Sequence, residues 1–91
     1  MALHLIFSPQ GLVQALARQH PNDPFLLLGD GVLSLQKLLH DRPEAKIYVV
    51  AQDAAARGIT LAALETSISA IDYAEFVDLT TQHSPIVSWK N

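Results

Sequence analysis

The sequence contains no cysteine among its 91 residues. A disulfide, a thiolate nucleophile, a persulfide and a cysteine-ligated metal are therefore excluded on this chain. Charge is also scarce, since only 16% of the residues are charged, against about 25% in an ordinary soluble domain. The six Lys and Arg residues are scattered and the formal net charge is −3. Binding through broad neutralisation of phosphates, and hence direct contact with nucleic acid, is not expected.

Long hydrophobic runs are absent as well. No apolar run approaches the ~20 residues that a membrane-spanning helix needs. The apolar start, Met1 to Phe7, lacks a basic segment and is interrupted by Ser8-Pro9, so we do not expect a secretory signal. These absences predict a cytoplasmic protein with no membrane partner.

What the chain does have is apolar residues, which make up 49% of it. High hydrophobicity and low charge exclude a disordered chain. The length fits a single domain, residues 1–91, with one small core. Because so small a domain hides little apolar surface, the composition also favours a protein partner.

Apolar runs of strand length alternate with amphipathic or capped segments. Strands are expected at Ala2–Phe7, Phe25–Leu28, Lys46–Ala51, Ser67–Ile71 and Ile86–Trp89. Runs without polar alternation are typical of strands buried on both faces. The order βαβαβα(β)αβ predicts an α/β fold: a small, open, mostly parallel sheet of about five strands with helices on both faces.

Capping residues mark where helices should begin. Ser8 followed by Pro9 predicts the start of the first helix, and Asp72 with Glu75 resembles a capping box. Asp53 is expected to cap a short helix over residues 54–57, with Gly58 just after its end. Thr60–Glu65 is a further possible helical turn. In the last helix one apolar face is expected, formed by Tyr73, Phe76, Val77 and Thr80.

Three aspartates follow predicted strands closely, namely Asp30, Asp53 and Asp72. Ligands of open α/β sheets bind outside the carboxyl ends of the strands, so the three carboxylates are candidates for a cluster lining a crevice. Helix capping explains all three on its own and is the favoured interpretation. Gly29-Asp30-Gly31 could be a phosphate-cradling turn, but it matches neither GxGxxG nor a P-loop, so a simple turn is favoured.

Other chemistry has little support. The four histidines are dispersed, with no i, i+4 pair, so we expect no metal site. The serines show no nucleophile elbow, so we expect no hydrolytic triad. The composition and motifs predict no cofactor and no catalytic residue. Trp89, in the last strand, is either a core residue or the anchor of a subunit interface.

Several segments together resemble the DsrH/TusB family of sulfur-relay proteins. They are Leu26–Val32, Tyr48–Asp53 running into Ala56–Ile59, Ile71–Thr81, and the closing Trp89. The blocks L-x-x-D-G-V, D-x-x-A-R-G and D-Y-x-x-F-V-x-L-T occur in the same order and spacing as in that family.

The resemblance implies a DsrEFH-like, flavodoxin-like topology. It also implies a heterohexamer with TusC/DsrF-like and TusD/DsrE-like subunits, served by TusA-like and TusE-like sulfur carriers. In the family's complexes the acceptor cysteine lies on the TusD/DsrE subunit, at a position that corresponds to about Val50–Asp53 here. Some DsrH members carry a cysteine in the first helix, where this chain has Ala15 or a neighbour. Neither segment holds a cysteine, and persulfide chemistry requires a thiolate.

Three functions remain as hypotheses. The first is a non-catalytic subunit of a TusBCD-like sulfurtransferase acting in 2-thiolation of the tRNA wobble uridine. The second is a DsrH-like subunit in dissimilatory sulfur oxidation, and the third is a free-standing module that binds a small ligand. The candidate interface or crevice residues are Asp30, Gly31, Asp53, Arg57, Gly58, Tyr73 and Trp89.

Overall fold

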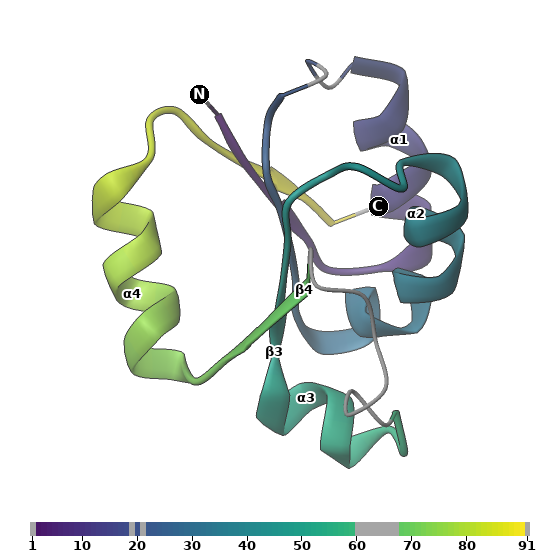
Figure 1. The fold of residues 1–91 in the computed structure, drawn as a ribbon, viewed down its shortest axis with the longest axis vertical. Coiled ribbons are helices and arrows are strands. Elements are labelled where there is room, and N and C mark those ends of the chain that lie inside the picture. Colours follow the sequence, from purple (N-terminus) through teal and green to yellow (C-terminus); the bar gives the residue numbers. More distant parts are fainter. Residues whose placement is uncertain (1, 19, 21, 60–67, 91) are drawn as a thin grey trace.

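The computed structural model describes residues 2–18, 20, 22–59 and 68–90, and its centre is one sheet of five parallel strands. The strands are β1 (Leu3–Ile6), β2 (Phe25–Leu27), β3 (Ile47–Val50), β4 (Ile68–Ile71) and β5 (Ile86–Trp89). Their order across the sheet is β4-β3-β2-β1-β5 (Figure 1). The expected open, parallel α/β sheet is confirmed.

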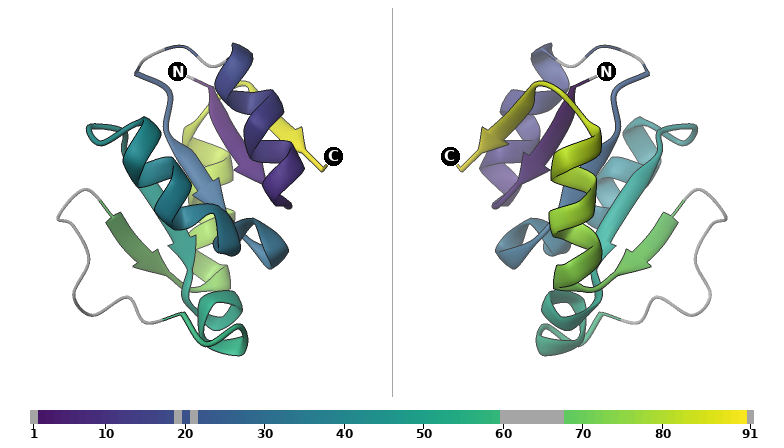
Figure 2. Two further views of the ribbon diagram at one scale, coloured as in Figure 1. Left: turned by 90° about the vertical axis from the view of Figure 1, so that its right-hand side faces the viewer. Right: turned by 90° about the vertical axis from the view of Figure 1, so that its left-hand side faces the viewer.

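Helices cover both faces of the sheet, as the sequence predicts. They are α1 (Pro9–Arg18), the 3-10 helix η1 (Gly29–Ser34), α2 (Leu35–Asp41), α3 (Ala51–Ala56) and α4 (Tyr73–Gln82). Figures 1 and 2 show α1 and α2 on one face, α4 on the other, and α3 at the end of the sheet where β3 finishes. Within the described part of the chain, no helix is long and apolar enough to cross a membrane.

The strand order explains which helix covers which face. The chain moves outward from β1 through β2 and β3 to β4, and then returns past all of them to β5. Right-handed crossovers in one direction place their helices on one face, and a crossover in the opposite direction places its helix on the other. The order also differs from the flavodoxin arrangement 2-1-3-4-5, because β3 pairs with β2 and not with β1.

Two apolar cores flank the sheet. The larger one lies under α1 and α2 and includes Ile6, Leu12, Phe25, Leu38 and Val49, all fully buried. The smaller one lies under α4 and is built mainly from strand residues, with Leu79 as its buried helical member. One helix therefore covers a whole face of the sheet.

Two of the predicted caps are confirmed. The Gly11 amide donates to Ser8 Oγ at 3.0 Å at the start of α1. At the start of α4, the Glu75 amide donates to Asp72 Oδ1 at 2.8 Å, and the Asp72 amide donates to Glu75 Oε1 at 3.2 Å. This reciprocal pair is the capping box that the sequence predicts.

Two local predictions are wrong. Asp53 does not cap α3, because the helix begins directly at the end of β3 with Val50 in the cap position and Asp53 already in the first turn. The predicted apolar face of α4 is wrong for Tyr73 and Val77, which are 47% and 57% exposed, whereas Phe76 and Thr80 are half-buried as expected and the buried residue is Leu79. The predicted helical turn at Thr60–Glu65 lies outside the described residues.

Gly31 allows η1 to pass directly over the end of β1. An added Cβ at this position would overlap the Ile6 carbonyl oxygen. Because the neighbour is backbone and not the end of a flexible side chain, η1 and β1 would have to separate. Gly58, just after α3, is different, since it has a φ of +71° but no atom within 4 Å of an added Cβ.

We expect Gly31→Ala to destabilise the fold by at least about 2 kcal/mol, because the clash separates η1 from β1. Gly58→Ala, the matched control, should cost only about 1 kcal/mol, since it introduces backbone strain without a clash. Urea unfolding of both variants measures the difference. Equal losses in the two would contradict the close approach of η1 to β1.

Candidate functional site

The carboxyl ends of β2, β3 and β4 bring most of the candidate residues to one end of the molecule. Asp30 and Gly31 belong to η1, which follows β2. Asp53 lies in α3, Arg57 and Gly58 directly follow it, and Tyr73 opens α4. Because all the strands are parallel, the segments that follow them meet at the same edge. Trp89 stands apart at the end of β5.

Asp53 is the centre of this edge. Its Oδ2 accepts a hydrogen bond from the Gly29 amide at 2.7 Å, and its Oδ1 accepts one from the Tyr73 hydroxyl at 2.6 Å. The carboxylate thus joins the segments that follow β2, β3 and β4. Burial raises the pKa of the Asp53 carboxyl, but its hydrogen bonds from Gly29 and Tyr73 outweigh burial, so the pKa lies below its usual value.

The hydrogen bond to Asp53 also acts on Tyr73. The hydrogen bond that the Tyr73 hydroxyl donates to Asp53 raises the pKa of the phenol, because it stabilises the protonated form; burial and the negative charge of the carboxylate raise the pKa further. Tyr73 is therefore held as a hydrogen-bond donor and is not activated as a base.

An ion pair between Arg57 and Asp30 lies at the more exposed side of this edge. Arg57 Nε and Nη2 donate to Asp30 Oδ1 at 3.0 and 2.9 Å, and Arg57 Nη1 donates to the Asp53 carbonyl at 3.2 Å. The Asp30 side chain is 65% exposed, so the ion pair adds little stability. Its role is to hold the end of α3 against η1.

The carboxyl ends of β3 and β4 form the topological switch point of the sheet, where the connections that follow two adjacent strands run to opposite faces. The chain leaves β3 toward α3, whose Ala54 packs in the core under α1 and α2, whereas it leaves β4 toward α4 on the opposite face. Open α/β sheets bind ligands in the crevice at such a point. Here Asp53 and Tyr73 bridge the crevice with each other, so its best-placed polar groups are already satisfied.

The structure also resolves the two interpretations of Gly29-Asp30-Gly31. The Gly29 amide donates to Asp53, and the Gly31 amide donates to the Leu28 carbonyl at 2.9 Å. A phosphate-cradling turn needs free amides that point at the ligand. The segment is instead the beginning of a 3-10 helix. Of the three candidate aspartates, only Asp72 is a cap.

Trp89 takes part in a buried polar chain that sequence reasoning missed. Trp89 Nε1 donates to His4 Nδ1 at 2.9 Å, and His4 Nε2 lies 2.9 Å from Asp23 Oδ2. An indole N–H can only donate, so His4 Nδ1 carries no proton, and a neutral His4 donates from Nε2 to Asp23. His4 and Asp23 are both buried, at 4% and 8% exposed.

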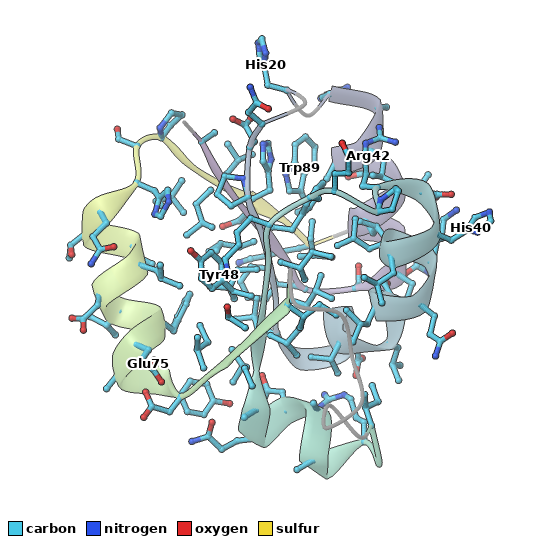
Figure 3. The ribbon with its side chains drawn as sticks, in the orientation of Figure 1. His20, His40, Arg42, Tyr48, Glu75 and Trp89 are labelled. Carbon is cyan, nitrogen blue, oxygen red and sulfur yellow. The ribbon has the colours of Figure 1, made fainter. Side chains whose placement is uncertain are left out.

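This polar chain links β5 and β1 to the segment just before β2. Trp89 is half-buried against the larger core, on the face of the sheet opposite to Tyr48 (Figure 3). The structure thus favours core packing for Trp89. Burial raises the pKa of the Asp23 carboxyl, but the hydrogen bond from His4 and those from backbone amides outweigh burial and place the pKa below its usual value.

No local pattern signals this chain of contacts. His4 and Asp23 are 19 residues apart, and His4 and Trp89 are 85 residues apart. His20 and His40 lie on different parts of the surface (Figure 3). Among the described residues, no group of three or more His, Asp or Glu side chains is placed to bind a metal ion.

Comparison with known proteins gives consistent matches. A protein-family model described as DsrH like protein matches residues 7–86. Protein TusB of Escherichia coli O81 (strain ED1a) is 38% identical over 72 residues, which cover 74% of this chain and 75% of the relative. Protein TusB of Shigella boydii serotype 18 (strain CDC 3083-94 / BS512) matches with the same identity and coverage.

We expect Asp53→Asn to lower the pKa of Tyr73 toward its ordinary value, because the substitution removes the negative charge beside the phenol. Ultraviolet difference spectroscopy during alkaline titration measures this pKa. The Tyr73→Phe variant identifies which part of the signal belongs to Tyr73, since the chain has two tyrosines. An unchanged Tyr73 titration in Asp53→Asn would contradict the bridge.

We expect Asp23→Asn to destabilise the fold by about 1–2 kcal/mol at neutral pH, because the carboxylate accepts several hydrogen bonds. The pKa of Asp23 is lowered in the fold. Its charged form therefore stabilises the protein above about pH 4, and this contribution is lost as pH falls through the folded-state pKa. The variant should consequently lose less stability than the parent between about pH 5 and pH 2.

Denaturant unfolding followed by the fluorescence of Trp89, the single tryptophan, measures these stabilities. The exposed Glu44→Gln serves as the control and should retain the acid dependence of the parent. If Asp23→Asn retains it as well, the carboxylate of Asp23 does not stabilise the fold.

Proposed function

The chain belongs to the DsrH family, and from that premise we propose that it is a cysteine-free, non-catalytic subunit of a TusBCD-like heterohexameric sulfurtransferase. The family match over residues 7–86 carries the proposal. In this complex, persulfide sulfur passes from a small carrier toward 2-thiolation of the tRNA wobble uridine. The cytoplasm, where tRNA is modified, is the corresponding location.

The chemistry of sulfur transfer supports a non-catalytic role. A persulfide forms on a thiolate, and none of the 91 residues is a cysteine. Sulfur must therefore be carried by partner subunits, with the acceptor cysteine on a TusD-like chain. A TusA-like protein would supply the sulfur and a TusE-like protein would accept it.

The geometry after β3 gives further support. The resemblance aligns the acceptor cysteine of the TusD-like subunit with the segment Val50–Asp53. In this chain that segment starts α3 directly, and Asp53 is held by hydrogen bonds from Gly29 and Tyr73. A closed hydrogen-bonded edge fits a subunit that stabilises a complex and does no chemistry there.

The charge distribution supports an indirect relation to tRNA. The net charge is −3, and the six Lys and Arg residues are dispersed along the chain. Neutralising a nucleic-acid backbone needs grouped Lys and Arg side chains. We therefore assign contact with tRNA to other components of the pathway.

Co-expression with TusC-like and TusD-like chains from the same genome tests the proposal. A tag on the TusD-like chain should recover all three chains in equal copies, and native mass spectrometry should give the mass of two copies of each. When the complex receives a persulfidated TusA-like carrier, the added sulfur should be found on the TusD-like chain and never on this one.

Deletion of the gene gives the functional readout. The deletion strain should lose most 2-thiouridine at the wobble position of its tRNAs, and the intact gene should restore it. A chain that purifies as a well-behaved monomer and captures neither partner contradicts the proposal. Normal thiolation in the deletion strain contradicts the tRNA role and favours a sulfur-oxidation complex.

A further inference from the structure

The outward surface of α4 carries apolar side chains that nothing in the described chain covers. This outer surface consists of Tyr73, Ala74, Val77, Asp78 and Thr81, all exposed. Tyr73 and Val77 are one helical turn apart and are 47% and 57% exposed. Two large apolar residues at i, i+4 spacing form a contiguous stripe along a helix.

The same helix, with its N-cap, carries three acidic side chains and no Lys or Arg. Asp72, Glu75 and Asp78 lie on α4 or cap it, and all six Lys and Arg residues lie on other elements. In the described part of the chain, Asp30 pairs with Arg57 and Asp41 with Lys37, Asp23 is hydrogen-bonded to a neutral His4, and no ion pair reaches α4. Three carboxylates therefore border the apolar stripe; Asp72 and Glu75 accept backbone amides in the capping box, and none of the three is in an ion pair among the described residues.

A shallow cavity beside the stripe extends this surface. It measures about 310 Å³, lies between α4 and β4, and has Glu75 and Asp78 among its lining residues. Tyr48, Ile71 and Leu79 supply apolar lining. Such a recess suits a long side chain with an apolar stem and a positive end, which is the chemistry of lysine and arginine.

We propose that the outer surface of α4 is the docking surface for a partner subunit that presents apolar side chains flanked by lysine or arginine. This inference rests on the proposed function, because it requires that the chain work within a complex. The apolar stripe supplies contact area, and the carboxylates select a partner of opposite charge. Lys or Arg of the partner enters the cavity beside Glu75 and Asp78.

Charge excludes a second copy of this chain as the occupant. Pairing two α4 surfaces about a two-fold axis would bring the carboxylates of one copy against those of the other, and no Lys or Arg lies on α4 itself to neutralise them. Lys46, which borders the cavity, already donates to Ser69 Oγ at 2.8 Å and lies over the Tyr48 ring. Like charges facing each other across an interface cost several kcal/mol. A partner of different sequence is therefore required.

The chain offers a closely matched pair of variants for the test. Val77 is the fifth residue of the ten-residue helix α4 and is 57% exposed, and Val13 is the fifth residue of the ten-residue helix α1 and is 59% exposed. The test variant is Val77→Ser/Asp78→Lys. The control is Val13→Ser/Glu44→Lys, which makes the same chemical changes at exposed sites elsewhere.

Both variants and the parent are co-expressed with the TusC-like and TusD-like chains, and the affinity of the purified subunits is then measured by titration. The α4 variant should bind its partner at least about tenfold more weakly, whereas the control should bind like the parent. Raising the salt concentration should reduce the loss of affinity that Asp78→Lys causes, because salt screens exposed charges. Thermal unfolding of each isolated variant verifies that it folds.

The outcomes separate this inference from the proposed function. If the parent captures its partners and the α4 variant binds equally well, or the control is weakened as much, the docking surface lies elsewhere while the proposed function stands. A parent homodimer that the α4 variant disrupts would overturn the choice of occupant. A parent that captures no partner overturns both.

Discussion

The whole structure depends on the direction of its crossovers. Because the chain moves outward from β1 to β4 and only then returns to β5, α1, α2 and α3 pack toward one side and α4 alone covers the other. Because of this path, the chain leaves the neighbouring strands β3 and β4 toward opposite faces of the sheet. The edge bridged by Asp53, the small second core and the exposed stripe on α4 all follow from this one topological constraint.

Hydrogen bonds between residues that are distant in the sequence join the segments at each end of the sheet. At the carboxyl end, Asp53 uses both oxygens to join the segments after β2, β3 and β4, so the natural ligand crevice of the fold is closed by the chain itself. Nearer the other end, Asp23, His4 and Trp89 tie the last strand to the first. Both networks join segments that are distant in the sequence and hold their polar side chains in hydrogen bonds within the fold.

Local signals predicted much of this arrangement. The positions of the strands, the Ser8 cap and the Asp72–Glu75 capping box depend on neighbouring residues, and the structure reproduces them, although β1 to β3 are one or two residues shorter than predicted. The errors arise where a distant partner intervenes. The local sequence predicts Asp53 as a helix cap, but the Tyr73 hydroxyl, 20 residues away, and the Gly29 amide, 24 residues away, donate to its carboxylate instead. Leu79, which no local pattern singled out, is buried because the sheet lies beneath it, and Val77 is left outside.

By itself the sequence determined the fold class, the absence of a thiol and hence of covalent sulfur transfer on this chain, and the family resemblance. Apolar periodicity, capping and residue chemistry are local properties, so they can be read directly from the order of residues. Only the tertiary structure decided that the crevice is bridged, that Trp89 bonds to a buried His4, and that the apolar stripe of α4 faces outward. Each of these depends on which strands become neighbours, and that is settled by the packing of the whole sheet.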